Sequence, residues 1–148
     1  WAGDVLAAVQ SALEDVSIFI AATAVADWRP ADFSTKKNKK DGSGAVPSLA
    51  FVENPDILAT VANSDRAQQG QLYCVGFAAE SDNLLAHASA KRVRKNVPLL
   101  VGNIGPATFG QDDNTLLLID AHGSSALPRA SKAQLGHALI AEIARRLP

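Results

Sequence analysis

The chain has 148 residues, of which 47% are hydrophobic and 20% are charged, and its formal net charge is -1. This length suits one domain with a sizeable core, and the balanced charge argues against a nucleic-acid-binding protein. No apolar run is long enough to cross a bilayer, and the first residues do not resemble a secretory leader. We therefore expect one soluble, cytoplasmic domain over residues 1–148, with neither a nucleic-acid nor a membrane partner.

The chain opens on a predicted helix rather than on a strand. Between Asp4 and Asp15 the apolar residues recur at helical spacing, and Asp4 can cap the start of the helix. Doubly wound domains normally begin with a strand and a phosphate-binding turn. We therefore expect an N-terminally truncated domain that lacks its first βαβ portion.

The next stretch passes from a strand into a polar loop. Residues 16–22 form a nearly continuous apolar run, which suits a parallel strand that is buried on both faces. Asp27, Trp28 and Arg29 then follow just beyond its carboxyl end, where ligands bind in open α/β sheets. An ordinary polar turn after a strand is the structural alternative.

A polar segment with a lysine run follows at residues 31–46, and we expect it to be a mobile loop. Lys36, Lys37, Lys39 and Lys40 lie within five positions. A solvated charged loop explains such a run without any function. A lysine that closes over a triphosphate is the functional alternative, because the loop leaves the carboxyl end of a strand.

Residues 47–53 alternate enough to predict a short strand, and a strong helix start follows them. Asn54 is a good N-cap, Pro55 suits the first helical position, and Asp56 favours the positive end of the helix dipole. The apolar face continues to about Ala67. Helix formation alone explains this motif, although backbone amides at such a start can also receive a ligand.

A second apolar strand is predicted over residues 72–77 and runs into Glu80. A helix from Ser81 follows, whose core face would carry Leu84, Leu85 and Ala88. Lys91 and Lys95 end this helix four residues apart, so they share a face. Cations suit a helix C-terminus, and a basic face turned toward a ligand is the functional alternative.

The remaining elements complete an α/β pattern. We expect strands over residues 98–102 and 115–120, a loop over 103–114 between them, and a short strand that ends near Leu127. Ser131 and Gln134 form a capping box for the final helix, whose core face would carry Leu135, Leu139, Ile143 and Leu147. The order of elements predicts a Rossmann-like, three-layer fold with a mostly parallel sheet flanked by helices.

The search for catalytic motifs yields no dinucleotide fingerprint, P-loop, nucleophile elbow, metalloprotease helix or paired-cysteine motif. Cys74 lies in an apolar run and is read as a core thiol, which fits a reducing cytoplasm. The remaining candidates for a functional site are three residues at strand ends, Asp27, Phe77 and Asn103, together with the segments that carry lysines. This combination favours electrostatic stabilisation of phosphates over acid/base chemistry.

Five motifs occur together and in order: Ala24-Val-Ala-Asp-Trp-Arg29, Lys37-Asn-Lys-Lys40, Asn54-Pro-Asp-Ile57, Val75-Gly-Phe-Ala-Ala-Glu80 and Lys91-Arg-Val-Arg-Lys-Asn96. Over essentially its whole length the chain closely resembles phosphopantothenoylcysteine synthetase, the ligase half of a bacterial bifunctional coenzyme A biosynthesis protein. That family joins 4'-phosphopantothenate to cysteine through an acyl-cytidylate, using CTP and Mg²⁺.

The resemblance implies a role for each matching position. Asp27 would bind the nucleotide, and Lys37 would reach its phosphates and act as the catalytic lysine. The CTP site would be completed by Pro55, Asp56, Ile57, Leu58, Phe77, Lys91 and Lys95. The resemblance indicates no residue of the chain as a ligand for Mg²⁺.

The resemblance also implies partners. The family is dimeric, so a homodimer is expected, together with fusion to or association with a flavin-dependent decarboxylase. Family members carry an earlier segment that contributes to the acyl-cytidylate site and has no counterpart here. A CTP-binding module without catalysis of its own is therefore one alternative, and a Rossmann-like flavin- or dinucleotide-binding domain is a weaker one.

Overall fold

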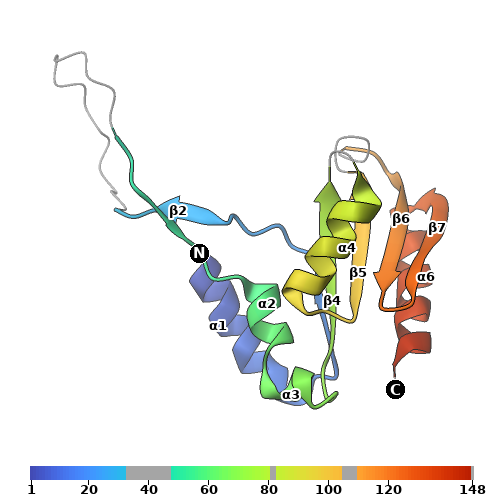
Figure 1. The fold of residues 1–148 in the computed structure, drawn as a ribbon, viewed down its shortest axis with the longest axis horizontal. Helices are drawn as coiled ribbons and strands as arrows, with labels where there is room; N and C mark the ends of the chain where they lie inside the picture. Colours follow the sequence, from blue (N-terminus) through green and yellow to red (C-terminus); the bar gives the residue numbers. More distant parts are fainter. Residues whose placement is uncertain (33–47, 81–82, 105–109, 148) are drawn as a thin grey trace.

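In a computed structural model, the chain forms a five-stranded sheet with helices on both faces and a two-stranded ribbon beside it (Figure 1). The structure describes residues 1–32, 48–80, 83–104 and 110–147. The sheet has the order β1 (Ile18–Ala21), β4 (Tyr73–Glu80), β5 (Leu99–Ile104), β6 (Asp113–Asp120) and β7 (Gly123–Ser131). The first three strands run parallel, and β6 is antiparallel to both β5 and β7. Only β6 of these strands therefore runs against the others, which confirms the predicted mostly parallel sheet.

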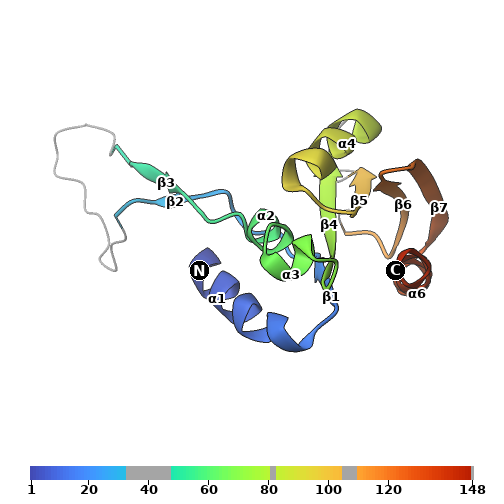
Figure 2. The same ribbon diagram turned by 60° about the horizontal axis from the view of Figure 1, so that its bottom comes forward.

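Helices cover both faces of the sheet. They are α1 (Ala2–Ala12), continued by η1 (Leu13–Asp15), then α2 (Ile57–Ala62), α3 (Asp65–Gln68), α4 (Leu84–Lys95) and α6 (Lys132–Arg146). One buried cluster joins α1, α2 and α4 to the sheet, and a second cluster joins α6 to its opposite face. Figure 2 shows α4 and α6 on opposite sides of β5 and β6. The three-layer, Rossmann-like prediction is confirmed. Within the described ranges, no helix combines the length and apolar character needed to cross a membrane.

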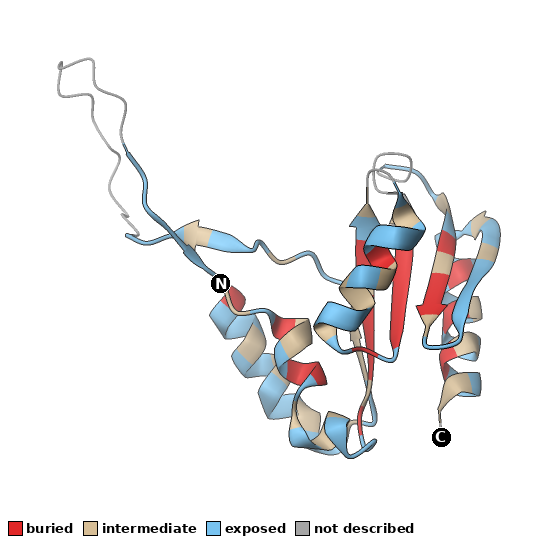
Figure 3. Ribbon diagram, in the orientation of Figure 1, coloured by how far each residue is buried: buried red, intermediate tan, exposed pale blue. Residues whose placement is uncertain are grey.

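The core lies along β4 and β5. Cys74 and Ala78 contribute to the cluster beneath α1, α2 and α4, whereas Val75 belongs to the cluster beneath α6. Leu99 and Leu100 in β5 face the two clusters in the same alternating way and are completely buried. Burial on both faces explains why these strands appear as continuous apolar runs in the sequence (Figure 3).

A glycine in β4 brings α2 close to the sheet. A Cβ atom built on Gly76 would lie 2.5 Å from Leu58 Cδ2 and 2.8 Å from Leu100 Cδ1. Both distances are far below normal van der Waals contact, so no other residue fits here without movement of its neighbours. The absence of a side chain at Gly76 therefore lets the start of α2 rest directly on the sheet.

The final helix begins as predicted. The Ser131 hydroxyl accepts a hydrogen bond from the Gln134 amide at 3.3 Å, and the Gln134 side chain accepts one from the Ser131 amide at 3.1 Å. Leu135, Leu139 and Ile143 are buried against the sheet. Leu147 was expected on the same face, but it follows the last helical residue and is only partly buried. β7 is also longer than predicted and reaches this cap.

Three further details of the first, second and fourth helices also differ from the prediction. The first helix starts at Ala2, so Asp4 is not its cap but lies in its first turn and accepts a hydrogen bond from the Trp1 amino group at 2.8 Å. The helix expected to reach Ala67 ends at Ala62, because Ser64 caps the separate helix α3. In α4, Leu84 packs on the core but Leu85 is 51% exposed, since consecutive helical residues point in different directions.

The ribbon is an element that the sequence patterns did not reveal. β2 (Trp28–Pro30) pairs antiparallel with β3 (Phe51–Glu53) and projects away from the sheet (Figure 1). The strand predicted over residues 47–53 is thus confirmed only in its last three positions. The predicted lysine loop, with Lys37, lies outside the described residues apart from its first two positions.

Candidate functional site

A cavity of about 670 Å³ opens at the carboxyl end of β1 and β4. We call it the carboxyl-edge cavity. Four segments line it: residues 21–28 after β1, residues 53–59 between the ribbon and α2, Phe77 and Ala79 of β4, and three cationic residues of α4. Crevices at this edge of an α/β sheet are the usual place for a ligand, and this volume is ample for one.

The cavity brings together the predicted binding residues that the structure describes. All eight of them line it: Asp27, Pro55, Asp56, Ile57, Leu58, Phe77, Lys91 and Lys95. Lys37, the ninth predicted residue, lies outside the described residues. Asn103, which the sequence placed at a neighbouring strand end, is not among the residues that line the cavity.

One wall is the start of α2, and its cap differs from the predicted one. Asp56, not Asn54, is the N-cap, and its carboxylate accepts a hydrogen bond from the Ala59 amide at 3.0 Å. Asn54 cannot take that place because its side chain is engaged elsewhere, donating to the Ala26 carbonyl at 2.8 Å. The helix consequently starts two residues later than the sequence suggested.

The opposite wall is basic and belongs to α4. Lys91 and Lys95 both line the cavity, which confirms that they share a face, and Arg94 lies between them. The sequence reasoning did not single out Arg94, although its spacing of three residues from Lys91 places it on the same side of a helix. These cations also lie near the helix C-terminus, where they interact favourably with its dipole.

Carboxylates hold both lysines in place. Lys95 forms an ion pair with Asp56 across the cavity, and Lys91 lies 3.8 Å from the Glu80 carboxylate at the end of β4. Burial pushes the pKa of Asp56 upward, but the hydrogen bond from Lys95, the Ala59 amide and the nearby positive charges outweigh it. The pKa of Asp56 therefore lies below its ordinary value. Asp56 is ionised at neutral pH and links the two walls.

The third wall is the base of the ribbon, and a few polar contacts hold it. Arg29 Nη1 donates to the Glu53 carbonyl and to Asn54 Oδ1, each at 3.0 Å. The Asn54 amide also donates to the Asp27 carbonyl at 2.7 Å. Trp28, Glu53 and Asn54 line the cavity, so these residues join the site beyond the predicted set. Only the pairing of the ribbon, which is remote in sequence, could have pointed to Glu53.

The chemistry of the lining is mixed in charge and partly aromatic. Lys91, Arg94 and Lys95 supply positive charge, while Asp27, Glu53 and Asp56 supply carboxylates that accept hydrogen bonds. Trp28 and Phe77 offer aromatic surface. Within the described chain, no group of three or more His, Cys, Asp or Glu side chains is arranged to hold a metal ion. This lining suits a ligand that carries phosphates at one end and hydroxyl or amine groups elsewhere.

Comparison with known families gives one match to nearly the whole chain. Residues 1–147 match the model of the DNA/pantothenate metabolism flavoprotein C-terminal domain. Among curated proteins, the chain is 39% identical over 144 residues to the coenzyme A biosynthesis bifunctional protein CoaBC of Escherichia coli strain K12. That alignment covers 95% of this chain but only 35% of the relative, so the chain spans about a third of that protein.

Two solved structures share the fold. The C-terminal domain of the coenzyme A biosynthesis bifunctional protein CoaBC aligns with a TM-score of 0.70 at 25% identity. The alignment covers 95% of this chain and 60% of that one. The DNA/pantothenate metabolism flavoprotein from Streptococcus pneumoniae aligns with a TM-score of 0.71 at 17% identity, covering 97% and 69% of the two chains. The latter similarity concerns the fold alone.

Proposed function

Because this chain belongs to the DNA/pantothenate metabolism flavoprotein C-terminal domain family, we propose that it is the nucleotide-binding part of a phosphopantothenate–cysteine ligase. In the proposed reaction, CTP activates 4'-phosphopantothenate and cysteine then forms the amide, a step of coenzyme A biosynthesis. The 39% identity to a CoaBC protein supports this assignment.

The observation that carries the proposal is the composition of the carboxyl-edge cavity. The residues that the resemblance implies for nucleotide binding come from four separate segments of the chain, and they line a single space of about 670 Å³. Motifs that merely stabilised their own helices would have no reason to converge. The three cations of α4 match the charge of a triphosphate, and Asp27 can accept hydrogen bonds from ribose hydroxyls.

The proposed chemistry needs no protein nucleophile. The substrate carboxylate attacks the α-phosphorus of CTP, a bond from oxygen to phosphorus forms, and pyrophosphate leaves. The amine of cysteine then attacks the acyl carbon and loses a proton to solvent, the carbon–oxygen bond to the phosphate breaks, and CMP leaves with those electrons. Lys91 and Lys95 would offset the repulsion between the two anionic reactants and stabilise the departing pyrophosphate.

Mg²⁺ is part of the proposal as a companion of the nucleotide. This cation usually binds to one or two carboxylates together with substrate phosphates, rather than in an all-protein cage. The lining fits that mode, because Asp27, Glu53 and Asp56 bring isolated carboxylates to the cavity. When bound, Mg²⁺ would supply additional positive charge to the phosphates.

Binding of CTP tests the site directly. We expect calorimetric titration in the presence of Mg²⁺ to show tighter binding of CTP than of ATP. Lys91→Gln should weaken CTP binding by about tenfold, since a charge-assisted contact is lost. Lys132→Gln is the matched control, because Lys132 begins α6 and does not line the cavity. A cooperatively folded chain that binds no CTP would refute the assignment.

Turnover tests the ligase reaction and the proposed catalytic role of Lys37. Pyrophosphate release would be followed with CTP, 4'-phosphopantothenate and cysteine. Lys37→Ala should slow release by more than about threefold; a smaller loss corresponds to less than roughly 1 kcal/mol and would remove Lys37 from that role. A folded chain that binds CTP but releases no pyrophosphate would favour the alternative of a nucleotide-binding module.

The ribbon supports the proposed homodimer. Trp28 is 60% and Phe51 56% exposed, although both are large and apolar. A two-stranded ribbon is marginally stable on its own, and the ribbon of a second copy could cover these side chains. Light scattering should therefore report a dimer that Phe51→Glu dissociates. Val93→Glu, at an exposed position of α4, should leave the dimer intact.

The remaining expected partner and the location follow from the same family membership. The relative in Escherichia coli is a bifunctional protein about three times as long as the matched region, which supports association with a flavin-dependent decarboxylase. A cytoplasmic location is supported by Cys74, a buried and unpaired thiol. A flavin bound to this chain itself would colour the protein, whereas a bound CTP would not.

A further inference from the structure

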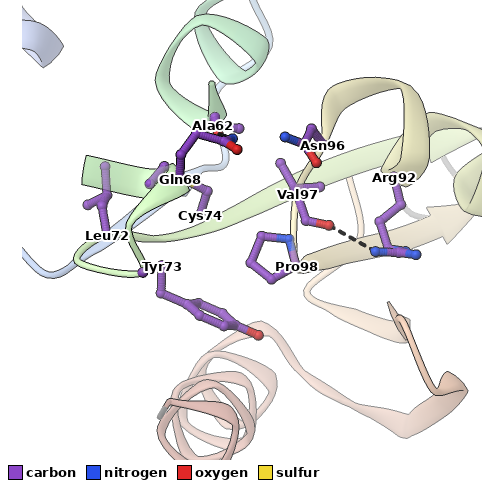
Figure 4. A pocket seen from close by; sticks show the side chains of 11 residues that line it. Ala62, Gln68, Leu72, Tyr73, Cys74, Arg92, Asn96, Val97 and Pro98 are labelled. Carbon is purple, nitrogen blue, oxygen red and sulfur yellow. Dashed lines mark hydrogen bonds between the residues drawn. The ribbon is translucent and has the colours of Figure 1, made fainter. Parts of the chain in front are cut away.

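A second cavity, of about 380 Å³, opens at the amino end of β4 and β5 (Figure 4). We call it the amino-edge cavity. Its lining residues come from α2, α3, the start of β4 and the segment from α4 to β5: Ala62, Ala67, Gln68, Gly70, Leu72, Tyr73, Cys74, Arg92, Asn96, Val97 and Pro98. None of these residues lines the carboxyl-edge cavity, so the two cavities are distinct.

The floor of this cavity is apolar and rigidly held. Leu72, Cys74 and Val97 are at most 3% exposed, and all belong to the buried cluster beneath α1, α2 and α4. Side chains in such a cluster cannot move outward to fill the space without losing their packing. The hollow is therefore a permanent feature of the surface rather than the result of a flexible side chain.

The rim is polar, and three of its side chains are fixed by hydrogen bonds. Gln68 Nε2 donates to the Ala62 carbonyl at 3.0 Å, and Asn96 Nδ2 donates to Asn63 Oδ1 at 3.2 Å. Arg92 Nη1 donates to the Val97 carbonyl at 3.1 Å, which orients the guanidinium along the rim (Figure 4). Figure 4 shows the Tyr73 ring directed toward α6, where it packs on the cluster of the opposite face of the sheet.

The charge of the residues that line this cavity favours a negatively charged ligand. Of the residues that line the cavity, Arg92 is the only one with a charged side chain, and no carboxylate is among them. The bond to Val97 uses one of the five N–H donors of the guanidinium. Within the described residues, the guanidinium makes no other hydrogen bond or ion pair, and its planar fork matches the geometry of a carboxylate with two parallel hydrogen bonds.

We propose that the amino-edge cavity is a second ligand site, which binds a small organic monocarboxylate with a compact apolar body. The carboxylate pairs with Arg92, and the apolar body lies over Leu72 and Val97. The volume lies near the lower end of the range for small-molecule sites, which suits a ligand smaller than a nucleotide. This site is independent of the proposed ligase chemistry at the other edge.

Benzoate is the probe for the test, and benzamide is its neutral counterpart of nearly the same shape. Titration of the isotopically labelled protein should move the backbone amide signals of Gly70, Tyr73 and Asn96. We expect benzoate to bind at least tenfold more tightly than benzamide, because only the carboxylate pairs with Arg92. Equal binding of the two compounds, or signal changes elsewhere only, would overturn the proposal.

Two further measurements separate the parts of the proposal. Arg92→Gln should remove the preference for benzoate, while Arg145→Gln, an exposed change of the same charge on α6, should preserve it. If Arg92→Gln does not fold, the benzoate and benzamide titrations of the unaltered protein still decide the matter. Inorganic phosphate should not displace benzoate at equal concentration. Displacement would show that the cavity binds any anion through its positive charge, and it would also overturn the proposal.

Discussion

Two walls of the carboxyl-edge cavity are stabilised in opposite ways. The wall formed by β4 and α2 rests on the core, where Val61, Ala78 and Leu100 are at most 1% exposed. The wall formed by the ribbon is exposed and is held by the hydrogen bonds of Arg29 and Asn54. Figure 3 shows this contrast between the buried sheet and the exposed ribbon.

Because of this difference, the two walls contribute unequally to the stability of the fold, although both shape the cavity. Apolar burial contributes much of the free energy of folding, whereas exposed hydrogen bonds contribute little net free energy. A change beneath α2 should therefore alter both the stability of the protein and the cavity. A change in the ribbon should alter the cavity while leaving the fold intact.

The largest effect is expected from Leu100→Ala, which removes a fully buried side chain beneath α2. We expect a loss of about 2–5 kcal/mol in the free energy of unfolding, from lost transfer free energy and the cavity left behind. Denaturant titration measures this value. Leu85→Ala is the control, and its 51% exposed side chain should change the free energy by less than about 0.5 kcal/mol. Equal effects of the two changes would abolish the contrast.

Gly76→Ala should have the next largest effect. The added methyl group meets Leu58 Cδ2 and Leu100 Cδ1 at 2.5 and 2.8 Å, so we expect a loss of about 1–3 kcal/mol from overpacking. Because Leu58 lines the carboxyl-edge cavity, CTP binding should weaken as well. Gly136→Ala in α6 meets nothing within 4 Å and should instead stabilise the protein by about 0.5–1 kcal/mol.

Substitutions at Asp56 distinguish its cap from its charge. Asp56→Ala removes both and should cost about 1 kcal/mol, whereas Asp56→Asn keeps a good N-cap and removes only the pairing with Lys95. The folded-state pKa of Asp56 lies below the unfolded value of 3.8, so its contribution is present above pH 3.8 and lost as the pH falls through the folded pKa.

Thermal melts of both Asp56 variants from pH 7 to pH 2 measure these contributions. The difference between the unaltered protein and Asp56→Asn should shrink as the pH falls below 3.8. A difference that stays constant over this range would show that the charge of Asp56 contributes nothing to folding.

The smallest change in stability is expected from Asn54→Ala at the base of the ribbon. Its side-chain hydrogen bonds are exposed or only partly buried, and we expect a loss of no more than about 0.5 kcal/mol. The position of Asp27 should nevertheless change, because Asn54 connects the β3 end to residues 26–29. CTP titration would then report weaker binding by a protein of unchanged stability. A large loss of stability would contradict the contrast, because it would show that the ribbon contributes to folding as the core does.

Local signals predicted most of the sheet and the final helix. The apolar run at residues 72–77 is a strand covered on both faces, and the Ser131–Gln134 capping box depends only on neighbours in sequence. The run at residues 16–22 does form a strand, but burial on both faces was wrong: β1 lies at the edge of the sheet, contains no buried residue, and its Ile18 is 38% exposed. The motif residues of the carboxyl-edge cavity were predictable for a different reason, namely the resemblance to a family.

Contacts between distant segments account for the failures. The ribbon pairs Trp28 with Glu53, and no periodicity in the sequence predicts this pairing. The same contacts explain the misplaced cap, because Asn54 is a good N-cap in isolation but is bonded here to Ala26 and Arg29. The end of α2 has a different cause, since Ser64 followed by Asp65 is itself a local cap signal, and it begins the separate helix α3.

The reactivity of Cys74 can report on local opening of the fold around it. Its thiol is the single sulfur atom of the chain, lies on the floor of the amino-edge cavity and is 1% exposed. Burial raises its pKa to about 11, so at pH 8 only about one molecule in a thousand carries the thiolate. Alkylation should therefore be slow and limited by opening between α2 and α4. Mass spectrometry of the single adduct would time that opening without an engineered label.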